Sequence, residues 1–325
     1  MLSTAENIVE QCAAAENEGH RHSTVVAIHP RPARTPRMLK GFCYTPPVIG
    51  RIAIGETVEQ NGKRIPRKSD EISITAQHKK DGQWVEHPLD AKLRNGKANE
   101  KLREIPVRLL FDDPDLSFRE SYEAFSGSRQ VCVGDGARAK RRGPDGGIEE
   151  IECNGPDSCA YGGAHRCKPF ARLNVQIDGQ DDPLSTFVFR TSGWNSIRTL
   201  RSKLEYLYGA FDGTIAGLPL KLVMRGKSTQ LSFNTPFFYL DLLLRDQTAI
   251  GVAEALEDQK MWRVGLRFNY VGLESAARHG LRNGAFEETQ DDAPDIEDWT
   301  ISSEVQGGNR SLDNVFTKAG EQQGE

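Results

Sequence analysis

The hydrophobic residues between positions 49 and 245 mostly alternate with polar ones. Ile72, Ile74 and Ala76 alternate in this way, and so do Leu173, Val175 and Ile177. A period of two is typical of a strand with one buried face. Asn61-Gly62 and Asp81-Gly82 are dipeptides that favour tight hairpin turns. The predicted strands cover 51–60, 63–69, 70–80, 83–89, 105–111, 172–178, 186–191, 218–225 and 235–245.

Helical spacing is clearest in residues 192–211, where the apolar positions recur every three or four residues and Asn195 or Ser196 could cap the start. A second helix is predicted over 247–260, ending before Met261. Shorter helices are expected at 5–15 and 118–127. The long apolar run at 235–245 predicts a strand that is buried on both faces.

These elements predict an α+β protein with four parts. Residues 1–47 form an N-terminal arm or linker, because five prolines fall between positions 29 and 47. Residues 48–130 form a β-rich module. Residues 131–275 combine a cysteine cluster with a C-terminal sheet-and-helix module. Residues 287–325 are expected to be a disordered tail, which the acidic composition favours.

Four of the six cysteines fall within 36 residues, in a stretch that glycine and proline dominate. They are Cys132, Cys153, Cys159 and Cys167. So few apolar residues surround them that hydrophobic packing alone cannot hold the stretch in shape. Four thiolates satisfy tetrahedral zinc, and a closed site of this kind is structural rather than catalytic. The sequence therefore predicts a zinc site that braces the C-terminal module.

Other interpretations of the cysteines stay open. His165 could replace one thiolate as the fourth ligand. Four thiolates could also hold an iron–sulfur cluster, although the spacing matches no common cluster pattern. The thiols could equally be unligated and simply packed in loops. Disulfides are disfavoured because the N-terminus has no secretory signal, so a cytoplasmic protein with reduced thiols is expected.

The net charge of −4 hides two regions of opposite sign. Residues 287–325 carry eleven acidic and two basic side chains, a net charge of −9, which leaves +5 for residues 1–286. A mildly basic body is compatible with nucleic-acid binding. The acidic tail could bind a partner or could simply be solvated.

Two groups of basic and aromatic residues are candidates for binding DNA or a partner. The first is a predicted loop between the first two cysteines, with Arg138, Lys140, Arg141 and Arg142. Such a loop could contact phosphates or be a solvated charged loop. The second group comprises Trp194, Arg198, Arg225 and Lys227. Stacking and charge together suit single-stranded nucleic acid, whereas Trp194 could instead pack in the core.

Several classes of function are disfavoured. The segment Arg225–Thr229 ends in Gly-Lys-Ser-Thr but lacks the first glycine of a phosphate-binding loop, so nucleotide binding is not expected. The chain contains neither H-E-x-x-H nor G-x-S-x-G, so it has neither of these two common enzyme motifs. The chain has no run of 18 apolar residues, so a membrane-spanning helix is not expected.

Taken together, several segments resemble the recombination-directionality-factor-like proteins of phages and integrative elements. The resemblance covers about residues 45–275, and its carriers include CNGPDSCAYGGAHRCKPFARLNVQI and FVFRTSGWNSIRTL. Members of this family are often labelled "hydrolase or metal-binding protein". The resemblance implies a non-catalytic accessory protein that binds a serine integrase and turns it toward excision.

The sequence thus supports a first hypothesis and two alternatives. The first is an accessory DNA-recombination protein of a mobile element, acting on a serine integrase, on DNA or on both. The first alternative is a single-stranded DNA-binding protein with an acidic tail that recruits partners. The second alternative is a metal-dependent hydrolase.

Overall fold

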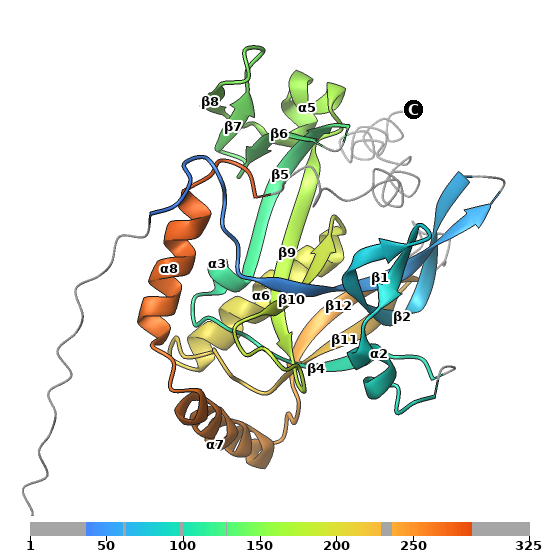
Figure 1. Ribbon diagram of the computed structural model, residues 1–325, viewed down its shortest axis with the longest axis vertical. Helices are drawn as coiled ribbons and strands as arrows, with labels where there is room; N and C mark the ends of the chain where they lie inside the picture. Colours follow the sequence, from blue (N-terminus) through green and yellow to red (C-terminus); the bar gives the residue numbers. More distant parts are fainter. Residues whose placement is uncertain (1–36, 61–62, 98–99, 128, 229–235, 288–325) are drawn as a thin grey trace, which may run out of the picture. The chain divides into compact units, whose positions relative to one another are not determined.

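The computed structural model describes residues 37–287, apart from 61–62, 98–99, 128 and 229–235. Its strands form a sheet of twelve, and helices lie against that sheet and at its ends (Figure 1). The strands are β1 (Val48–Gln60), β2 (Lys63–Lys80), β3 (Gln83–Glu86), β4 (Glu104–Arg108), β5 (Phe118–Ser126), β6 (Arg129–Gly134), β7 (Arg138–Arg142), β8 (Ile148–Glu152), β9 (Lys168–Ile177), β10 (Thr186–Thr191), β11 (Leu220–Lys227) and β12 (Phe237–Leu244). The helices are α2 (Pro88–Leu93), α3 (Pro114–Ser117), α4 (Gly155–Ser158), α5 (Ala160–Ala164), α6 (Trp194–Ala210), α7 (Ala249–Leu266) and α8 (Tyr270–Arg282).

Strand β9 is the centre of the sheet. The main order is β3-β2-β1-β10-β9-β5-β6-β7-β8, and β4, β11 and β12 form a branch that also joins β9. Only β1 and β10 pair in parallel among the described strands. The later strands β9 and β10 therefore lie between the earlier strands β1 and β5 in one sheet, and the predicted boundary at residue 130 falls inside β6.

One face of the central strands carries the main hydrophobic core. Leu173 on β9 lies opposite Phe189 on β10 and Phe118 on β5, and all three side chains are almost fully buried. Leu200 and Leu204 of α6 belong to the same core. Burying each such side chain stabilises the fold by about 1.5–3 kcal/mol. The prediction of a strand at 172–178 and a helix at 192–211 is confirmed, with β9 starting at Lys168 and α6 capped by Gly193.

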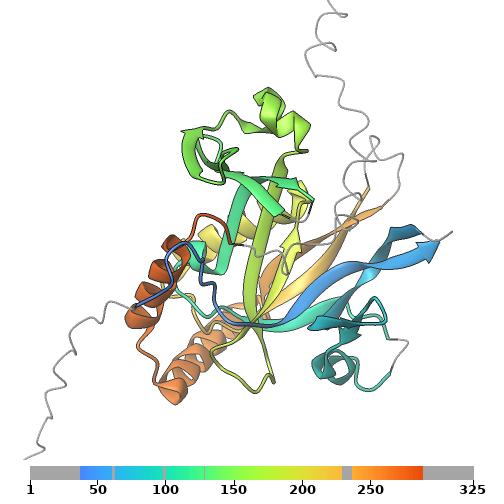
Figure 2. The same ribbon diagram turned by 45° about the horizontal axis from the view of Figure 1, so that its top comes forward.

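The other face of β9 is also covered, although its side chains are polar. All positions from 170 to 177 are buried, including Arg172, Asn174 and Gln176. Two peripheral segments lie on this side, one before β1 and one after α8 (Figure 2). The strand therefore alternates between an apolar face and a polar face that is equally shielded from water.

The two peripheral segments hold each other. The Tyr44 amide donates to the Gly280 carbonyl at 3.0 Å, and Gly41 forms a bridge with Gly284. The Asn283 side chain donates to the carbonyls of residues 39 and 42. A Cβ at Gly284 would lie 2.4 Å from the backbone nitrogen of Cys43, so this close approach requires glycine. We call residues 38–45 together with 283–287 the clasp.

Several predicted elements differ from the structure. Residues 118–126 form β5 instead of a short helix, because both edges of this segment pair, one with β6 and one with β9. The helix predicted to end before Met261 continues to Leu266, where Arg267 ends it in a left-handed conformation. Residues 138–142 form β7 rather than a loop. The predicted helix at 5–15 lies outside the described residues, as does the acidic tail beyond residue 287.

Helix α8 was not predicted. It packs its apolar side chains on a small second core formed by Leu110, Phe111 and Leu116. The carboxylate of Glu274 accepts from the backbone amides of Asp112 and Asp113, at 2.7 and 2.9 Å. These contacts fix the direction in which the chain leaves α8 and enters the clasp.

Candidate functional site

The four clustered cysteines line one small cavity at the end of the sheet where β5 and β9 approach β6, β7 and β8. Cys132 lies in β6, Cys153 follows β8, Cys159 separates α4 from α5, and Cys167 precedes β9. The cavity measures about 20 Å³, which is close to the space of a single water molecule or ion. Four separate segments of the chain therefore meet around a space of atomic size.

Two glycines keep this cavity open. A Cβ at Gly134 would lie 2.7 Å from the Cys153 sulfur. A Cβ at Gly162 would lie 3.1 Å from the Cβ of Cys167 and 3.3 Å from that of Cys159. Side chains at either position would push the thiols apart, so glycine is needed here for close approach rather than for a turn.

The thiols are set by short backbone contacts. The Gly162 amide donates to the Cys159 sulfur at 3.2 Å, and the Cys167 amide donates to the Gly162 carbonyl at 2.7 Å. Burial, together with the other cysteines of the cavity, raises the pKa of the Cys167 thiol to about 12. Burial and Cys153 likewise raise the pKa of Cys132. Four negative sulfurs at this site are thus unfavourable unless a cation balances them.

The donor set fits a closed thiolate site, but the side chains are not yet arranged around a common point. Within the described part of the chain, no three His, Cys, Asp or Glu side chains stand ready to ligate a metal ion. The described cysteines are free thiols. His165, the alternative ligand, packs against Tyr161 with the two rings tilted and their centroids 4.3 Å apart.

The basic residues between the first two cysteines lie on a strand whose partner is acidic. In the β7–β8 hairpin, Arg138 is opposite Glu152, Lys140 opposite Glu150, and Arg141 opposite Glu149. Arg142 lies over the ring of Phe286 at 4.4 Å and donates to the Gln130 carbonyl. Opposite charges in such pairs attract each other across the strands, which reduces the positive field of this hairpin.

The second predicted group is spread over two elements. Trp194 begins α6, is 51% exposed, and meets Tyr122 edge-on with ring centroids 6.4 Å apart. Arg198 is exposed on the same helix. Arg225 on β11 lies 3.4 Å from an oxygen of Asp241, and Lys227 is exposed at the end of that strand. Trp194 is therefore a surface residue and not part of the main core.

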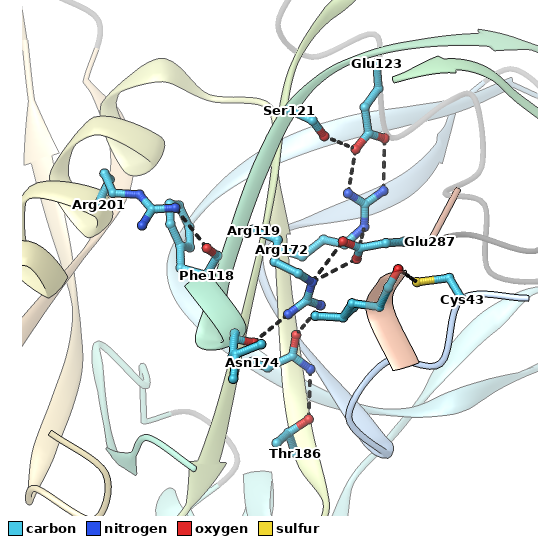
Figure 3. Close-up of polar contacts among 12 residues, drawn as sticks. Cys43, Phe118, Arg119, Ser121, Glu123, Arg172, Asn174, Thr186, Arg201 and Glu287 are labelled. Atoms are coloured by element: carbon cyan, nitrogen blue, oxygen red, sulfur yellow. Dashed lines mark hydrogen bonds and ion pairs between the residues drawn. The ribbon is translucent and has the colours of Figure 1, made fainter. Parts of the chain in front are cut away.

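A third cluster, which the sequence did not single out, lies on the polar face of the central strands (Figure 3). Arg119 on β5 is directly opposite Arg172 on β9, and Arg172 is opposite Arg190 on β10. We call these three residues the arginine row. Arg172 is 4% exposed and forms two hydrogen bonds with Glu123, which is 1% exposed.

Glu287 of the clasp lies over the arginine row. Both of its oxygens accept from Arg119 Nε, at 3.0 and 2.9 Å. Burial alone would raise the pKa of Glu287, but Arg119, Arg172 and Arg190 together lower it below its ordinary value. The only feature of the sequence that could have indicated the arginine row is the alternation of Arg172 and Asn174 with apolar residues. The same alternation is equally typical of a strand whose polar face is solvated.

Comparison with known proteins identifies the family of the chain. No curated protein and no solved structure is detectably similar to the chain. None of the described helices combines the length and apolar character that a membrane span requires. The sequence model of the Gp3-like proteins, described as recombination directionality factor-like, matches residues 49–245. That segment includes β1 to β12, the cysteine cavity and the arginine row, and it covers more than half of the chain. The chain therefore belongs to the recombination directionality factor-like family, whose description points to an accessory role in recombination of phages and mobile elements.

Proposed function

We propose that this protein is a non-catalytic accessory factor that binds the serine integrase of its mobile element and directs it toward excision. The family match carries the proposal, because it covers β1 to β12 and contains the cysteine cavity. The strands and short helices around that cavity form the contact surface for the integrase.

The surface of the β7–β8 hairpin favours a protein partner over DNA. Three of its basic side chains are opposite glutamates, so few positive charges remain to attract phosphates. Ile148, on the neighbouring strand, is 48% exposed, and Tyr161 of α5 packs against the Arg141 guanidinium. An exposed apolar residue and a half-buried aromatic residue among paired charges are typical of protein interfaces.

We further propose that zinc occupies the cysteine cavity, held by Cys132, Cys153, Cys159 and Cys167. Its support is the space of about 20 Å³ that all four thiols line and that Gly134 and Gly162 keep open. Zinc would supply positive charge and tie together four segments that otherwise share few apolar contacts. The thiols would have to turn toward the metal, and His165 would stay outside the ligand set.

The integrase experiment uses the full-length protein, the serine integrase of the same element, and DNA substrates for integration and for excision. We expect the two proteins to co-elute and the excision product to form only when both are present. Ile148→Asp should weaken the complex, whereas Tyr206→Ala, which changes a side chain that is 76% exposed on α6, should not. An integrase whose reactions are the same with and without this protein would refute the proposal.

Metal analysis tests the zinc site separately. Protein purified under reducing conditions without chelator should contain about one zinc per chain, because four thiolates complete one tetrahedral site. Protein without bound metal would contradict the assignment. If the protein instead contains iron and shows the absorption of an iron–sulfur cluster, the cysteines hold that cluster and not zinc.

A second candidate function is binding of single-stranded DNA. The half-exposed Trp194 beside the exposed Arg198 favours it, because base stacking and charge together bind single strands. Gel shifts with single- and double-stranded DNA across a salt series distinguish this function from the first. Tight, salt-sensitive binding to single strands, lost in Trp194→Ala but not in Tyr206→Ala, would support it. A metal-dependent hydrolase would instead require an open metal position next to carboxylates.

A further inference from the structure

The arginine row places three positive charges side by side across three adjacent strands. Arg119, Arg172 and Arg190 are direct neighbours in the register of β5, β9 and β10. Like charges directly opposite each other destabilise a sheet, and burial increases the penalty. The row can persist only because anions lie against it, so it is a site built to receive carboxylates.

The guanidinium groups of Arg119 and Arg172 are fixed by hydrogen bonds to groups other than Glu287. Arg172 donates through both terminal nitrogens to Glu123, at 2.5 and 2.9 Å. Arg119 donates to the Leu116 carbonyl at 2.8 Å and to the side-chain oxygen of Asn174 at 2.9 Å. Asn174 in turn donates to the Thr186 hydroxyl at 2.8 Å. These bonds fix both guanidiniums before any further anion arrives, which lowers the entropy lost on binding.

Glu287 fills the position that this arrangement prepares. Its carboxylate lies within 3.0 Å of Arg119 Nε and 3.9 Å from Arg172 Nε. Figure 3 shows Arg119, from β5, bonded to the Glu287 carboxylate and Arg172, from β9, directed at Glu123, while Glu287 comes from the segment after α8. The carboxylate is thus contributed by a segment outside the sheet, whereas every arginine of the row is fixed within it.

The neighbouring residue completes the contact. Phe286 is 8% exposed, and the Arg142 guanidinium lies 4.4 Å from its ring centre. Glu287 itself is 24% exposed, so water reaches the edge of the site. An aromatic residue followed by a carboxylate is therefore what this surface binds.

We propose that the arginine row and the adjacent Arg142 surface form a binding site for an aromatic–acidic peptide, which the chain's own Phe286 and Glu287 occupy until a partner segment of the same kind displaces them. The charges favour an exchange over an empty site. Glu287 is the carboxylate that accepts from Arg119, so its withdrawal would remove that counter-ion from a guanidinium that is only 11% exposed. A partner carboxylate restores the balance.

Because Phe286 and Glu287 are joined to the site by the chain itself, this connection determines how tightly a partner peptide must bind to displace them. A segment joined to its site by a short connection acts at an effective concentration of about millimolar. A free peptide therefore binds the natural chain only weakly, even when its intrinsic affinity is high. Removing the internal occupant should raise the apparent affinity of the peptide by about tenfold or more.

The experiment compares the full-length natural protein with the double variant Phe286→Ala/Glu287→Gln. The probe is a fluorescently labelled peptide with the sequence of residues 283–290, and fluorescence anisotropy measures its binding. We expect the double variant to bind at least about tenfold more tightly than the natural chain. A probe with glutamine in place of its first glutamate should lose this affinity, and so should the double variant when Arg119→Gln is added.

Each other result overturns the proposal. Equal affinities for the natural chain and the double variant, or no binding to a folded double variant, would show that the site does not exchange its occupant. Displacement of the probe by millimolar inorganic phosphate would assign the site to phosphate groups instead of carboxylates. Circular dichroism checks folding, and if the double variant unfolds, the single variant Glu287→Gln takes its place under the same criteria.

Discussion

The cysteine cavity and the arginine row adjoin the same strand but solve opposite electrostatic problems. Cys167 immediately precedes β9, and Arg172 lies within it. In the arginine row, the chain supplies both signs of charge, since Glu123 and Glu287 face the guanidiniums. The cysteine cavity gathers potential anions only. A charged cluster with its own counter-ions is complete as folded, whereas a cluster of thiolates needs a cation from outside.

The two clusters also differ in their scaffolds. The arginine row stands on three hydrogen-bonded strands, with the hydrophobic core on their reverse face. The cysteines lie in β6, just after β8, between α4 and α5, and just before β9, and these two helices have only four and five residues. Helices of this length are unstable on their own. Local stability is therefore expected to come from the sheet in one cluster and from the metal in the other.

The largest effect is expected from Cys159→Ser. Structural zinc contributes about 10 kcal/mol or more of binding free energy in small zinc domains, so the loss of one ligand should open residues 131–167. We expect the bound zinc to fall and proteolysis to begin within this segment, while β9, β10 and α6 stay protected. Cys43→Ser is the matched control, because that thiol lies in the clasp and donates to the Leu281 carbonyl. Equal zinc content in both variants would remove the contrast between the two clusters.

Glu123→Gln should be the most damaging change in the arginine row. It removes the charge of the carboxylate that pairs with the buried Arg172, and breaking a buried ion pair costs about 3–5 kcal/mol. Urea unfolding measures the loss. The control is Glu120→Gln on the same strand, where a more exposed carboxylate contacts Arg201 and the expected loss is below about 1 kcal/mol. Similar losses in the two variants would mean that burial does not distinguish these pairs.

Glu287→Gln should have a smaller effect, because the clasp is peripheral. Removing a charged hydrogen-bond acceptor costs about 1.5–3 kcal/mol. Hydrogen exchange should become faster in residues 280–287 and 38–45, while exchange in β9 changes little. Glu257→Gln on α7, an exposed carboxylate, is the control and should leave the clasp unaffected. If only β9 were to exchange faster, Glu287 would be a structural counter-ion and not a displaceable one.

Protonation of Glu287 at low pH should have the same effect as Glu287→Gln, because both remove the negative charge. Folding lowers the pKa of Glu287 from its ordinary value of 4.5, since the guanidiniums of the row outweigh the effect of burial. The stabilisation it provides is therefore complete above pH 4.5 and is lost as the pH falls through the lower pKa of the folded state. The difference in unfolding free energy between the natural chain and Glu287→Gln should shrink below pH 4.5. A difference that stays constant to pH 3 would contradict this assignment.

The smallest effect is expected in the β7–β8 hairpin. Glu150→Lys places a lysine directly opposite Lys140, which costs about 0.2–1 kcal/mol. Urea unfolding and metal content should change little, but DNA binding should increase if paired charges normally suppress it. Glu254→Lys on α7 makes the same change of charge elsewhere on the surface. Equal DNA binding by both variants would show that the local pairing is not what matters.

The sequence predicted most of the core because the relevant signals are local. Alternation located β9 and β10, helical spacing located α6, and Asp81-Gly82 located the β2–β3 turn, where both residues adopt positive φ. The segment at 118–126 misled, because its local pattern suits a helix while its strand partners are distant in sequence. Pairing with β9 joins residues about fifty positions apart, which no local pattern records.

The arginine row was missed for a related reason. Its residues alternate correctly for a strand, but alternation cannot say whether the polar face meets water or other parts of the chain. Here that face is covered by the clasp, whose two halves come from opposite ends of the described chain. The cysteine spacing, by contrast, was visible because unusual residue types mark it, although the number and type of ligands do not follow from spacing alone.

The parallel pairing of β1 with β10 has a consequence for how the chain is made. Val48 pairs with Thr186, so 138 further residues must be synthesised after the start of β1 before its partner strand β10 begins. At a synthesis rate of about 5–20 residues per second, this delay is roughly 7 to 28 seconds. The β1–β2 hairpin can form during that time, but one edge of β1 remains open to other chains. The newly made protein should therefore depend on chaperones that shield strand edges far more than its finished sheet suggests.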